Sequence, residues 1–185
     1  MSRRSQYSLA RWTPRRRRFV LIVVVLAVVI VVRWWRDPSL PPLPEALAEG
    51  EYRVGRVVDG DTLLLTNRAK VRLIGADTPE TVMPGHPVEP FGPEATDFTQ
   101  RFVDRENGRV RLQFDRERID KFGRFLAYVW VDDRMLNEEL IRAGLATAET
   151  GFRYSSTMKT RFRRAEEEAR AAGLGIWSDR DPAGR

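Results

Sequence analysis

The chain has 185 residues, a length that fits one compact domain plus an additional segment. It contains no cysteine, which excludes disulfides, thiolate metal sites and a cysteine nucleophile. His86 is the single histidine, so a histidine-based triad, an HExxH zinc site or a histidine metal cluster is unavailable or incomplete. Hydrolytic chemistry in this chain must therefore rest on carboxylates, arginines, hydroxyl groups and a hard metal ion.

The formal net charge of +6 comes from the first 50 residues. These residues hold nine arginines against three acidic residues, whereas residues 51–185 hold 23 basic and 23 acidic residues. Clustered basic residues bind nucleic acid by releasing counterions from its phosphates. Because residues 51–185 are formally neutral, any such affinity there must come from the local placement of charge.

An apolar run of fourteen residues, Phe19–Val32, follows seven arginines. As a helix it is about 21 Å long, less than the roughly 30 Å hydrocarbon core, but Trp34 and Trp35 extend it into the interface and flanking arginines can reach outward. We predict a transmembrane signal-anchor at 19–35 that leaves the arginine-rich residues 1–18 in the cytoplasm. A helix of the domain core is the alternative, and the flanking arginines argue against it.

Small residues that suit signal cleavage do not follow this run directly. The first such pattern, Ala46-Leu47-Ala48, lies well downstream. We therefore expect a single-pass membrane protein whose C-terminal domain is extracytoplasmic, with secretion after cleavage as the alternative. Residues 36–50 include four prolines and are predicted to be an extended linker.

Five strands are predicted in the domain at residues 51–180. Tyr52–Val58, Thr62–Leu65 and Lys70–Ile74 are apolar and β-branched segments separated by short turns, which indicates a three-stranded meander. Val110–Phe114 and Leu126–Val131 have the same character. Five short strands of this kind suit a small closed barrel.

Three helices are predicted to accompany the barrel. The first spans Gly92–Asn107, where apolar residues recur at helical spacing after Pro93. The second begins near Leu136 and is closed by Gly144, and the third runs from about Ser156 to Ala172. Because the helices are segregated from the strands, the expected class is α+β.

Three polar motifs are expected at strand ends or turns. They are Asp59-Gly60-Asp61-Thr62, the segment Arg72–Thr81 with sequence RLIGADTPET, and Asp120-Lys121-Phe122-Gly123-Arg124. Each motif alone is consistent with an ordinary turn or a solvated strand residue. Together with Gly92–Ala95, Asn137-Glu138 and Gly175–Trp177, in this order, they resemble the staphylococcal nuclease family over about residues 52–178.

This resemblance implies an OB-fold barrel and a calcium-dependent nuclease that hydrolyses DNA or RNA with water, typically leaving 3′-phosphate ends. It matches Asp61 and Asp77 to metal-binding carboxylates and Thr78 to a carbonyl ligand of the ion. It matches Glu80 to the proposed general base. The remaining matches are Arg72 and Arg124, which hold the phosphate, and Lys121, which lies near the nucleotide.

The residue types fit this chemistry independently of the resemblance. Phosphodiester hydrolysis builds negative charge on an anionic centre, so cations must face the phosphate oxygens and a group must deprotonate water. An arginine fork binds two oxygens at once, which a lysine does not. Carboxylates suit a hard ion such as Ca²⁺, whose flexible coordination accommodates a carbonyl and water molecules.

The chain departs from the family's best-known member at positions that concern the substrate. Phe122, predicted to bind substrate, and Thr150 stand where that protein has tyrosines, and 82–87 replaces a lysine-rich loop. These changes bear on substrate affinity more than on catalysis. The alternatives to a monomeric nuclease are a catalytically inactive OB-fold module that binds nucleic acid or protein, and a membrane-tethered scaffold.

Overall fold

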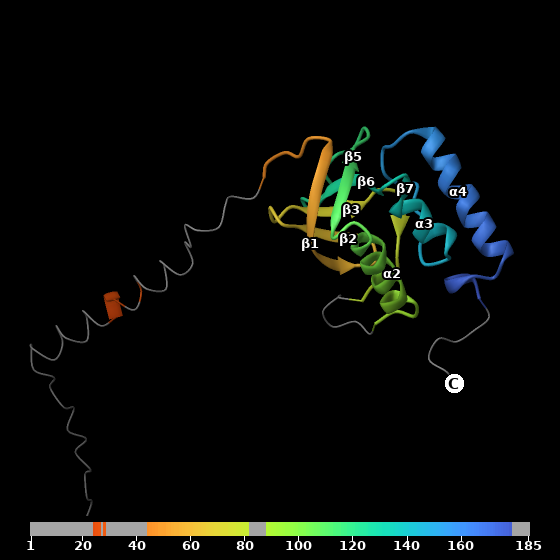
Figure 1. Ribbon diagram of the computed structural model, residues 1–185, viewed down its shortest axis with the longest axis horizontal. Helices are drawn as coiled ribbons and strands as arrows, with labels where there is room; N and C mark the ends of the chain where they lie inside the picture. Colours follow the sequence, from red (N-terminus) through yellow and green to blue (C-terminus); the bar gives the residue numbers. More distant parts are fainter. Residues whose placement is uncertain (1–23, 27, 29–43, 82–87, 179–185) are drawn as a thin grey trace, which may run out of the picture. The chain divides into compact units, whose positions relative to one another are not determined.

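A closed five-stranded barrel is at the centre of the folded unit (Figure 1). The computed structural model describes residues 24–26, 28, 44–81 and 88–178. Within the barrel, neighbouring strands are antiparallel except for β3 and β6, whose parallel pairing closes it. The strands are β1 (Gly50–Asp59), β2 (Thr62–Leu65), β3 (Lys70–Leu73), β5 (Arg109–Gln113) and β6 (Phe125–Val131). The predicted α+β fold with a five-stranded OB-type barrel is confirmed.

Alternation of side chains explains how the strands form one core. In β5, Val110 and Leu112 are buried while Arg109 and Arg111 are exposed, as expected where one sheet face meets the core and the other meets solvent. β6 is different, because six of its seven residues are buried. It lies at the closure of the barrel, between β3 and β5.

The three predicted helices are present as α2 (Gly92–Asp104), α3 (Leu136–Arg142) and α4 (Ser156–Ala171). α2 ends three residues before its predicted end, because Asn107 and Gly108 adopt the left-handed backbone conformation that stops a helix. The hydroxyl of Ser155 accepts a hydrogen bond from the Met158 N–H and caps α4. A short 3₁₀ turn, η1 (Gly175–Trp177), follows α4.

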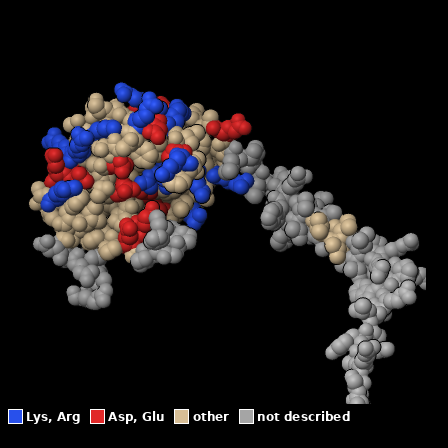
Figure 2. Space-filling model, turned by 180° about the vertical axis from the view of Figure 1, so that it is seen from behind, with Lys and Arg blue, Asp and Glu red and all other residues tan. Residues whose placement is uncertain are grey.

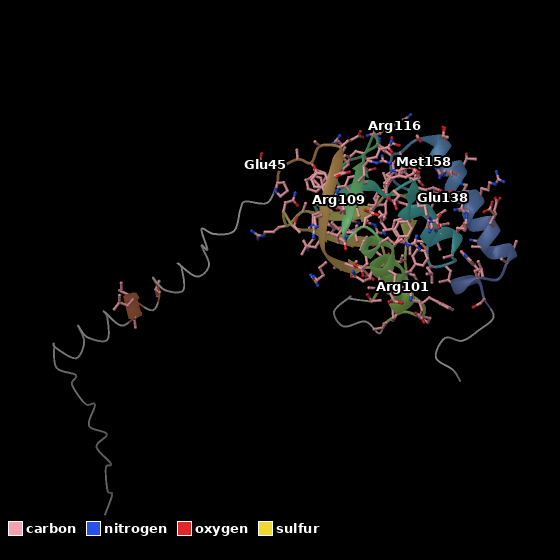
Figure 3. All side chains as sticks on the ribbon, in the orientation of Figure 1. Glu45, Arg101, Arg109, Arg116, Glu138 and Met158 are labelled. Carbon is pink, nitrogen blue, oxygen red and sulfur yellow. The ribbon has the colours of Figure 1, made fainter. Side chains whose placement is uncertain are left out.

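Ion pairs join α3 to α4. The carboxylate of Glu138 on α3, labelled in Figure 3, accepts hydrogen bonds from Arg142 of the same helix at 2.6 Å and from Arg161 of α4. Burial raises the pKa of Glu138, but the hydrogen bonds and charges of Arg161 and Arg142 outweigh it, so the pKa lies below its ordinary value. The pair of helices is thereby held together by a charged cluster as well as by packing.

Three short strands were not predicted. β4 (Ala76–Asp77) pairs with β8 (Thr147–Ala148) in a separate two-stranded sheet, and β7 (Arg134–Met135) extends β6 as a hairpin. Strands of two residues carry no periodicity from which to predict them. The β4–β8 pairing places the segment after Thr147 beside the motif that contains Asp77.

The folded unit extends further towards the N-terminus than residue 51. Leu47 is 5% exposed and belongs to the core, and its carbonyl accepts a hydrogen bond from Arg118 Nη2 at 2.6 Å. The Glu49 side chain accepts from the Phe114 N–H at 3.0 Å. The chain divides into one unit at Met1–Pro42 and another at Leu43–Arg185.

The predicted membrane anchor lies largely outside the described residues, which include only 24–26 and 28 of the span 19–35. Among the described residues, no helix has the length and apolar character needed to cross a membrane. Acidic and basic side chains are intermingled on the face of the folded unit shown in Figure 2, in keeping with its balanced charge.

Candidate active site

A buried ion-pair cluster lies where β2 and β3 meet. Arg72 of β3 pairs in register with Thr62, so its side chain lies next to Asp61, which immediately precedes β2. Arg72 Nη1 is 2.8 Å from Asp61 Oδ2, and Nη2 contacts Asp77 Oδ1. The Arg72 and Asp61 side chains are only 8% and 5% exposed. Two carboxylates therefore converge on one guanidinium group.

Asp61 is the most buried charged group of this cluster. Burial raises its pKa, and the charge of Arg72 and hydrogen bonds from the Thr62 hydroxyl and the Thr78 N–H offset only part of this effect. For Arg72, burial lowers the pKa, but Asp61 and Asp77 raise it by more, so the guanidinium stays charged. A nearby cation stabilises the charged form of a buried carboxylate whose pKa is raised.

The residues predicted to hold a metal are adjacent in the structure. Asp77 ends β4, and its neighbour Thr78 donates its backbone N–H to Asp61 Oδ2 at 3.2 Å. The carboxylates of Asp61 and Asp77 already meet at one cation, the Arg72 guanidinium. In the described part of the chain, no three acidic or histidine side chains form a metal-binding cluster. Carboxylate oxygens suit a hard ion such as Ca²⁺, for which Asp61 and Asp77 would supply two of the oxygen ligands and the Thr78 carbonyl a third.

Asp59, for which no role was predicted, holds the loop that carries Glu80. Its buried carboxylate accepts hydrogen bonds from Thr81 Oγ1 at 2.7 Å, from the Gly60 N–H at 2.8 Å, and from Thr81 N and Thr96 Oγ1 at 3.4 Å each. These bonds tie the β1–β2 turn to the loop and to α2. Asp61 therefore faces Arg72, whereas Asp59 faces the loop that carries Glu80.

Glu80 is partly buried beside this network. Burial raises its pKa, and a hydrogen bond with Asp59 and the negative charges of Asp59 and Asp61 raise it further, while Arg72 lowers it. Its backbone N–H donates to Glu89 Oε2 at 3.0 Å. A carboxylate with a raised pKa accepts a proton more readily than a carboxylate with an ordinary pKa.

The turn between β5 and β6 positions Arg124. The Asp120 carboxylate accepts hydrogen bonds from the backbone N–H groups of Phe122 and Arg124, both at 2.9 Å, and from Arg124 Nε at 2.7 Å. Gly123 has a φ of +76°, which L side chains rarely adopt, so the turn requires a glycine there. Phe122 at the tip is 70% exposed, and the cations of Lys121 and Arg124 lie over its ring.

A cavity of about 510 Å³ brings these groups together. Arg72, Glu80, Phe122 and Arg124, all predicted site residues, line it. Lys121 lines an adjoining hollow, while Asp61, Asp77 and Thr78 are not among the lining residues of either. Lys70, Glu149 and Phe152 also line the cavity, and the sequence motifs did not indicate them.

Comparison with known proteins identifies the family. A model described as "Staphylococcal nuclease homologue" matches residues 70–179. The chain is 43% identical over 134 residues to the thermonuclease of Staphylococcus hyicus, covering 71% of this chain and 78% of that protein. The chain belongs to the staphylococcal nuclease family.

Further relatives of this family member are also nucleases by name. The thermonuclease of Staphylococcus intermedius is 47% identical over 131 residues, which cover 68% of this chain and 75% of that protein. Endonuclease YncB of Bacillus subtilis (strain 168) is 38% identical over 127 residues, which cover 66% of this chain and 59% of that protein. The predicted family is confirmed, and the cavity lies within the segment matched by the family model.

The family motifs in this chain therefore occupy one site. Two arginines and Glu80 face a common cavity, with two carboxylates and Thr78 behind Arg72. His86 and the loop 82–87 lie outside the described residues. Thr150 falls in the segment between Glu149 and Phe152, two residues that line the cavity.

Proposed function

We propose that this chain is a calcium-dependent nuclease that hydrolyses phosphodiester bonds of DNA, RNA or both in this cavity. Family membership makes the chain a phosphodiester hydrolase. The observation that carries the proposal is the convergence of Arg72, Arg124 and Glu80 on one cavity backed by Asp61 and Asp77. Cationic forks and a base facing the same space are what phosphodiester hydrolysis by water requires.

The side chains of the chain divide the reaction between them. Arg124 and Arg72 bind phosphate oxygens, orient the phosphorus and stabilise the charge that builds on these oxygens. Glu80 accepts a proton from a water molecule, whose oxygen forms a bond to phosphorus. The bond to the leaving oxygen breaks with its electron pair on that oxygen, which takes up a proton from solvent water. Asp61, Asp77 and Thr78 would hold Ca²⁺, which when bound supplies further positive charge to the phosphate.

We infer that the substrate is a nucleic-acid strand, either DNA or RNA. Lys70, Arg72 and Arg124 supply positive charge at the cavity, although residues 51–185 as a whole are neutral. Phe122 and Phe152 add aromatic surface on which a base can stack, a contact that tolerates any base sequence. Local placement of charge and aromatic rings therefore supports a nucleic-acid substrate where net charge did not.

The direct test is hydrolysis by a fragment that begins at Leu43, because Leu47 and Glu49 belong to the folded unit. We expect it to digest DNA or RNA with added Ca²⁺ and to stop when a chelator is added. A folded fragment that is inert on both polymers with Ca²⁺ present would instead support the inactive binding module. The matched control is Asp97→Asn, which removes a carboxylate from the exposed side of α2 and is expected to leave the rate unchanged.

We also propose that the domain lies on the extracytoplasmic side of a membrane, held by an uncleaved anchor at residues 19–35. Seven arginines precede the apolar run and only Arg33 and Arg36 follow it closely, which favours a cytoplasmic N-terminus. The buried side chain of Leu47 favours retention of the anchor. Cleavage after Ala48 would remove Leu47, whose side chain packs in the core, and burial of a leucine contributes about 1.5–3 kcal/mol. Retention therefore preserves a core contact that cleavage at this position would lose.

Protease added outside intact spheroplasts tests this topology. We expect the protease to reach and digest the domain, and we expect the mature protein to retain its arginine-rich N-terminus. Protection of the domain from external protease would contradict the orientation. A mature N-terminus near Glu49 would show that the domain is released.

A further inference from the structure

Glu149 places a carboxylate in the cavity where the substrate is proposed to bind. It directly follows β8, and the β4–β8 pairing brings it to the cavity wall beside Phe122 and Phe152. It also lines the adjoining hollow of about 410 Å³, which shares Phe122, Arg124 and Phe152. A negative charge at this point repels the phosphates of a substrate. Glu149 therefore does not serve to bind phosphate.

The local structure fixes the position of this carboxylate. The Glu149 N–H donates to the Gly75 carbonyl at 3.1 Å, and the Glu149 carbonyl accepts from the Tyr154 hydroxyl at 2.7 Å. The Gly151 N–H donates to Glu149 Oε1. Among the described residues, no lysine or arginine forms an ion pair with Glu149, and Oε2 accepts no hydrogen bond. The side chain is therefore held in place with acceptor capacity left over.

The general base is already supplied by Glu80, and the proposed metal ligands lie behind Arg72. A carboxylate can accept hydrogen bonds from the N–H groups of the bases, from the 2′-hydroxyl of ribose and from the hydroxyls at strand ends. Of these donors, only the base N–H groups are present along the interior of both DNA and RNA strands. A base stacked on Phe122 or Phe152 turns its edge towards the cavity wall, in the manner of single-stranded recognition. Glu149 is on that wall.

The four kinds of base present different edges to a carboxylate. Guanine presents two adjacent donors, N1–H and the N2 amino group, which match the two oxygens of one carboxylate. Adenine and cytosine present one amino group beside a ring nitrogen that accepts, and thymine and uracil present one N–H between two carbonyl oxygens. Acceptors that face the carboxylate are repelled by it, so the guanine edge is the best complement.

We propose that Glu149 is a specificity-determining residue that favours guanine in an unpaired stretch of the substrate. This inference rests on the proposed function, because it assigns the substrate preference of the same cavity. A carboxylate that accepts two hydrogen bonds from one base is expected to discriminate by about tenfold in kcat/KM, at the lower end of what bidentate base contacts give.

The experiment uses single-stranded oligonucleotides that differ in one central base, with cleavage near that base followed by gel electrophoresis. For the wild-type protein we expect kcat/KM to be about tenfold higher with guanine than with thymine. In Glu149→Gln the preference should fall below about twofold, because the amide replaces one acceptor by a donor. The control Glu117→Gln changes a carboxylate that lines only the adjoining hollow and should keep the preference.

Gly151 offers a second variant that retains the carboxylate. A Cβ at position 151 would lie 2.8 Å from Glu149 Oε1, too close for both to stay in place. The end of the glutamate side chain must then move, so Gly151→Ala should weaken the guanine preference while cleavage of thymine-containing oligonucleotides continues at a similar rate. A preference that survives in both Glu149→Gln and Gly151→Ala overturns the proposal, and so does its absence from the wild type.

Binding separates this inference from the proposed activity. Phosphorothioate trinucleotides with a central guanine or thymine are titrated into the protein in the presence of Ca²⁺ and followed by calorimetry. Hydrolysis can fail while the wild type binds the guanine trinucleotide about tenfold more tightly than the thymine trinucleotide and Glu149→Gln binds the two equally. In that case the nuclease proposal is wrong, and the proposed guanine preference of Glu149 is retained. Equal wild-type affinity for the two trinucleotides overturns base reading whatever the activity.

Discussion

Replacement of Asp120 by asparagine tests whether Arg124 acts from a fixed position. The Asp120 carboxylate makes two separable sets of contacts. One oxygen accepts hydrogen bonds from the backbone N–H groups of Phe122 and Arg124, and the other accepts a hydrogen bond from Arg124 Nε. Asparagine can keep its carbonyl oxygen towards the backbone while it turns an amino group towards Nε. The turn is then retained, and the ion pair with Arg124 is lost.

The expected size of the effect follows from the burial of the pair. The Asp120 side chain is 4% exposed and that of Arg124 is 23% exposed, so the hydrogen bond is charge-assisted and largely shielded. Such bonds contribute about 1.5–3 kcal/mol, and loss of the same amount from the transition state corresponds to a fall in kcat of about 10- to 150-fold. Asp120→Ala also removes both backbone contacts, which costs about 1 kcal/mol each in the free energy of unfolding.

The assay combines steady-state kinetics with urea unfolding for the wild type, Asp120→Asn and Asp120→Ala. We expect Asp120→Asn to lose kcat with a small loss of stability, and Asp120→Ala to lose both. In an Arg124→Ala background, Asp120→Asn should have little further effect on kcat, because residues that act through one contact are not additive. A folded Asp120→Asn protein with wild-type kcat would refute the reasoning that Arg124 depends on this carboxylate.

Three further variants address single groups. Glu80→Gln should lower kcat by at least about 100-fold without unfolding the protein, as expected for loss of a general base, and near wild-type turnover would contradict its role. Phe122→Tyr should lower KM with kcat nearly unchanged, since a hydroxyl bound to a phosphate adds about 0.5–1.5 kcal/mol of uniform binding; a rise in kcat with constant KM would place the hydroxyl in the transition state. Glu138 has a folded-state pKa below its ordinary value of 4.5, so its stabilisation is present above pH 4.5 and is lost as pH falls through the lower folded value. Glu138→Gln should therefore reduce the free energy of unfolding by about 1–3 kcal/mol at pH 7, with a difference from wild type that shrinks in acid; a constant difference in urea titrations would show that the charge is not the cause.

Local patterns in the sequence were sufficient for the barrel and the helices. The alternation in Arg109–Gln113 and the apolar run Phe125–Val131 predict strands because their side chains report burial directly. Arg72, Glu80 and Arg124 line the cavity, and the sequence indicates them because they lie in motifs with a recognisable order. These features depend on neighbours along the chain.

The features that were missed depend on contacts between distant segments. Ala76–Asp77 becomes a strand only by pairing with Thr147–Ala148, and no pattern in two residues indicates a partner seventy positions away. Glu149 and Phe152 reach the cavity through that pairing. Asp59 lies in one of the predicted motifs, but its role was missed for the same reason. The hydroxyl groups of Thr81 and Thr96, which donate hydrogen bonds to Asp59, come from a loop and a helix far along the chain.

Asp61 and Asp77 are proposed to hold a calcium ion, and hydrolysis is proposed to depend on that ion. This proposal is tested most directly by the rate of DNA hydrolysis as a function of free Ca²⁺, for the wild type and for Asp77→Asn. We expect the wild-type rate to saturate with Ca²⁺ and to return to zero with chelator, and the midpoint for Asp77→Asn to shift to at least about tenfold higher Ca²⁺, as for loss of one charged ligand. Hydrolysis that persists in chelator, or an unchanged midpoint in Asp77→Asn, would contradict the account.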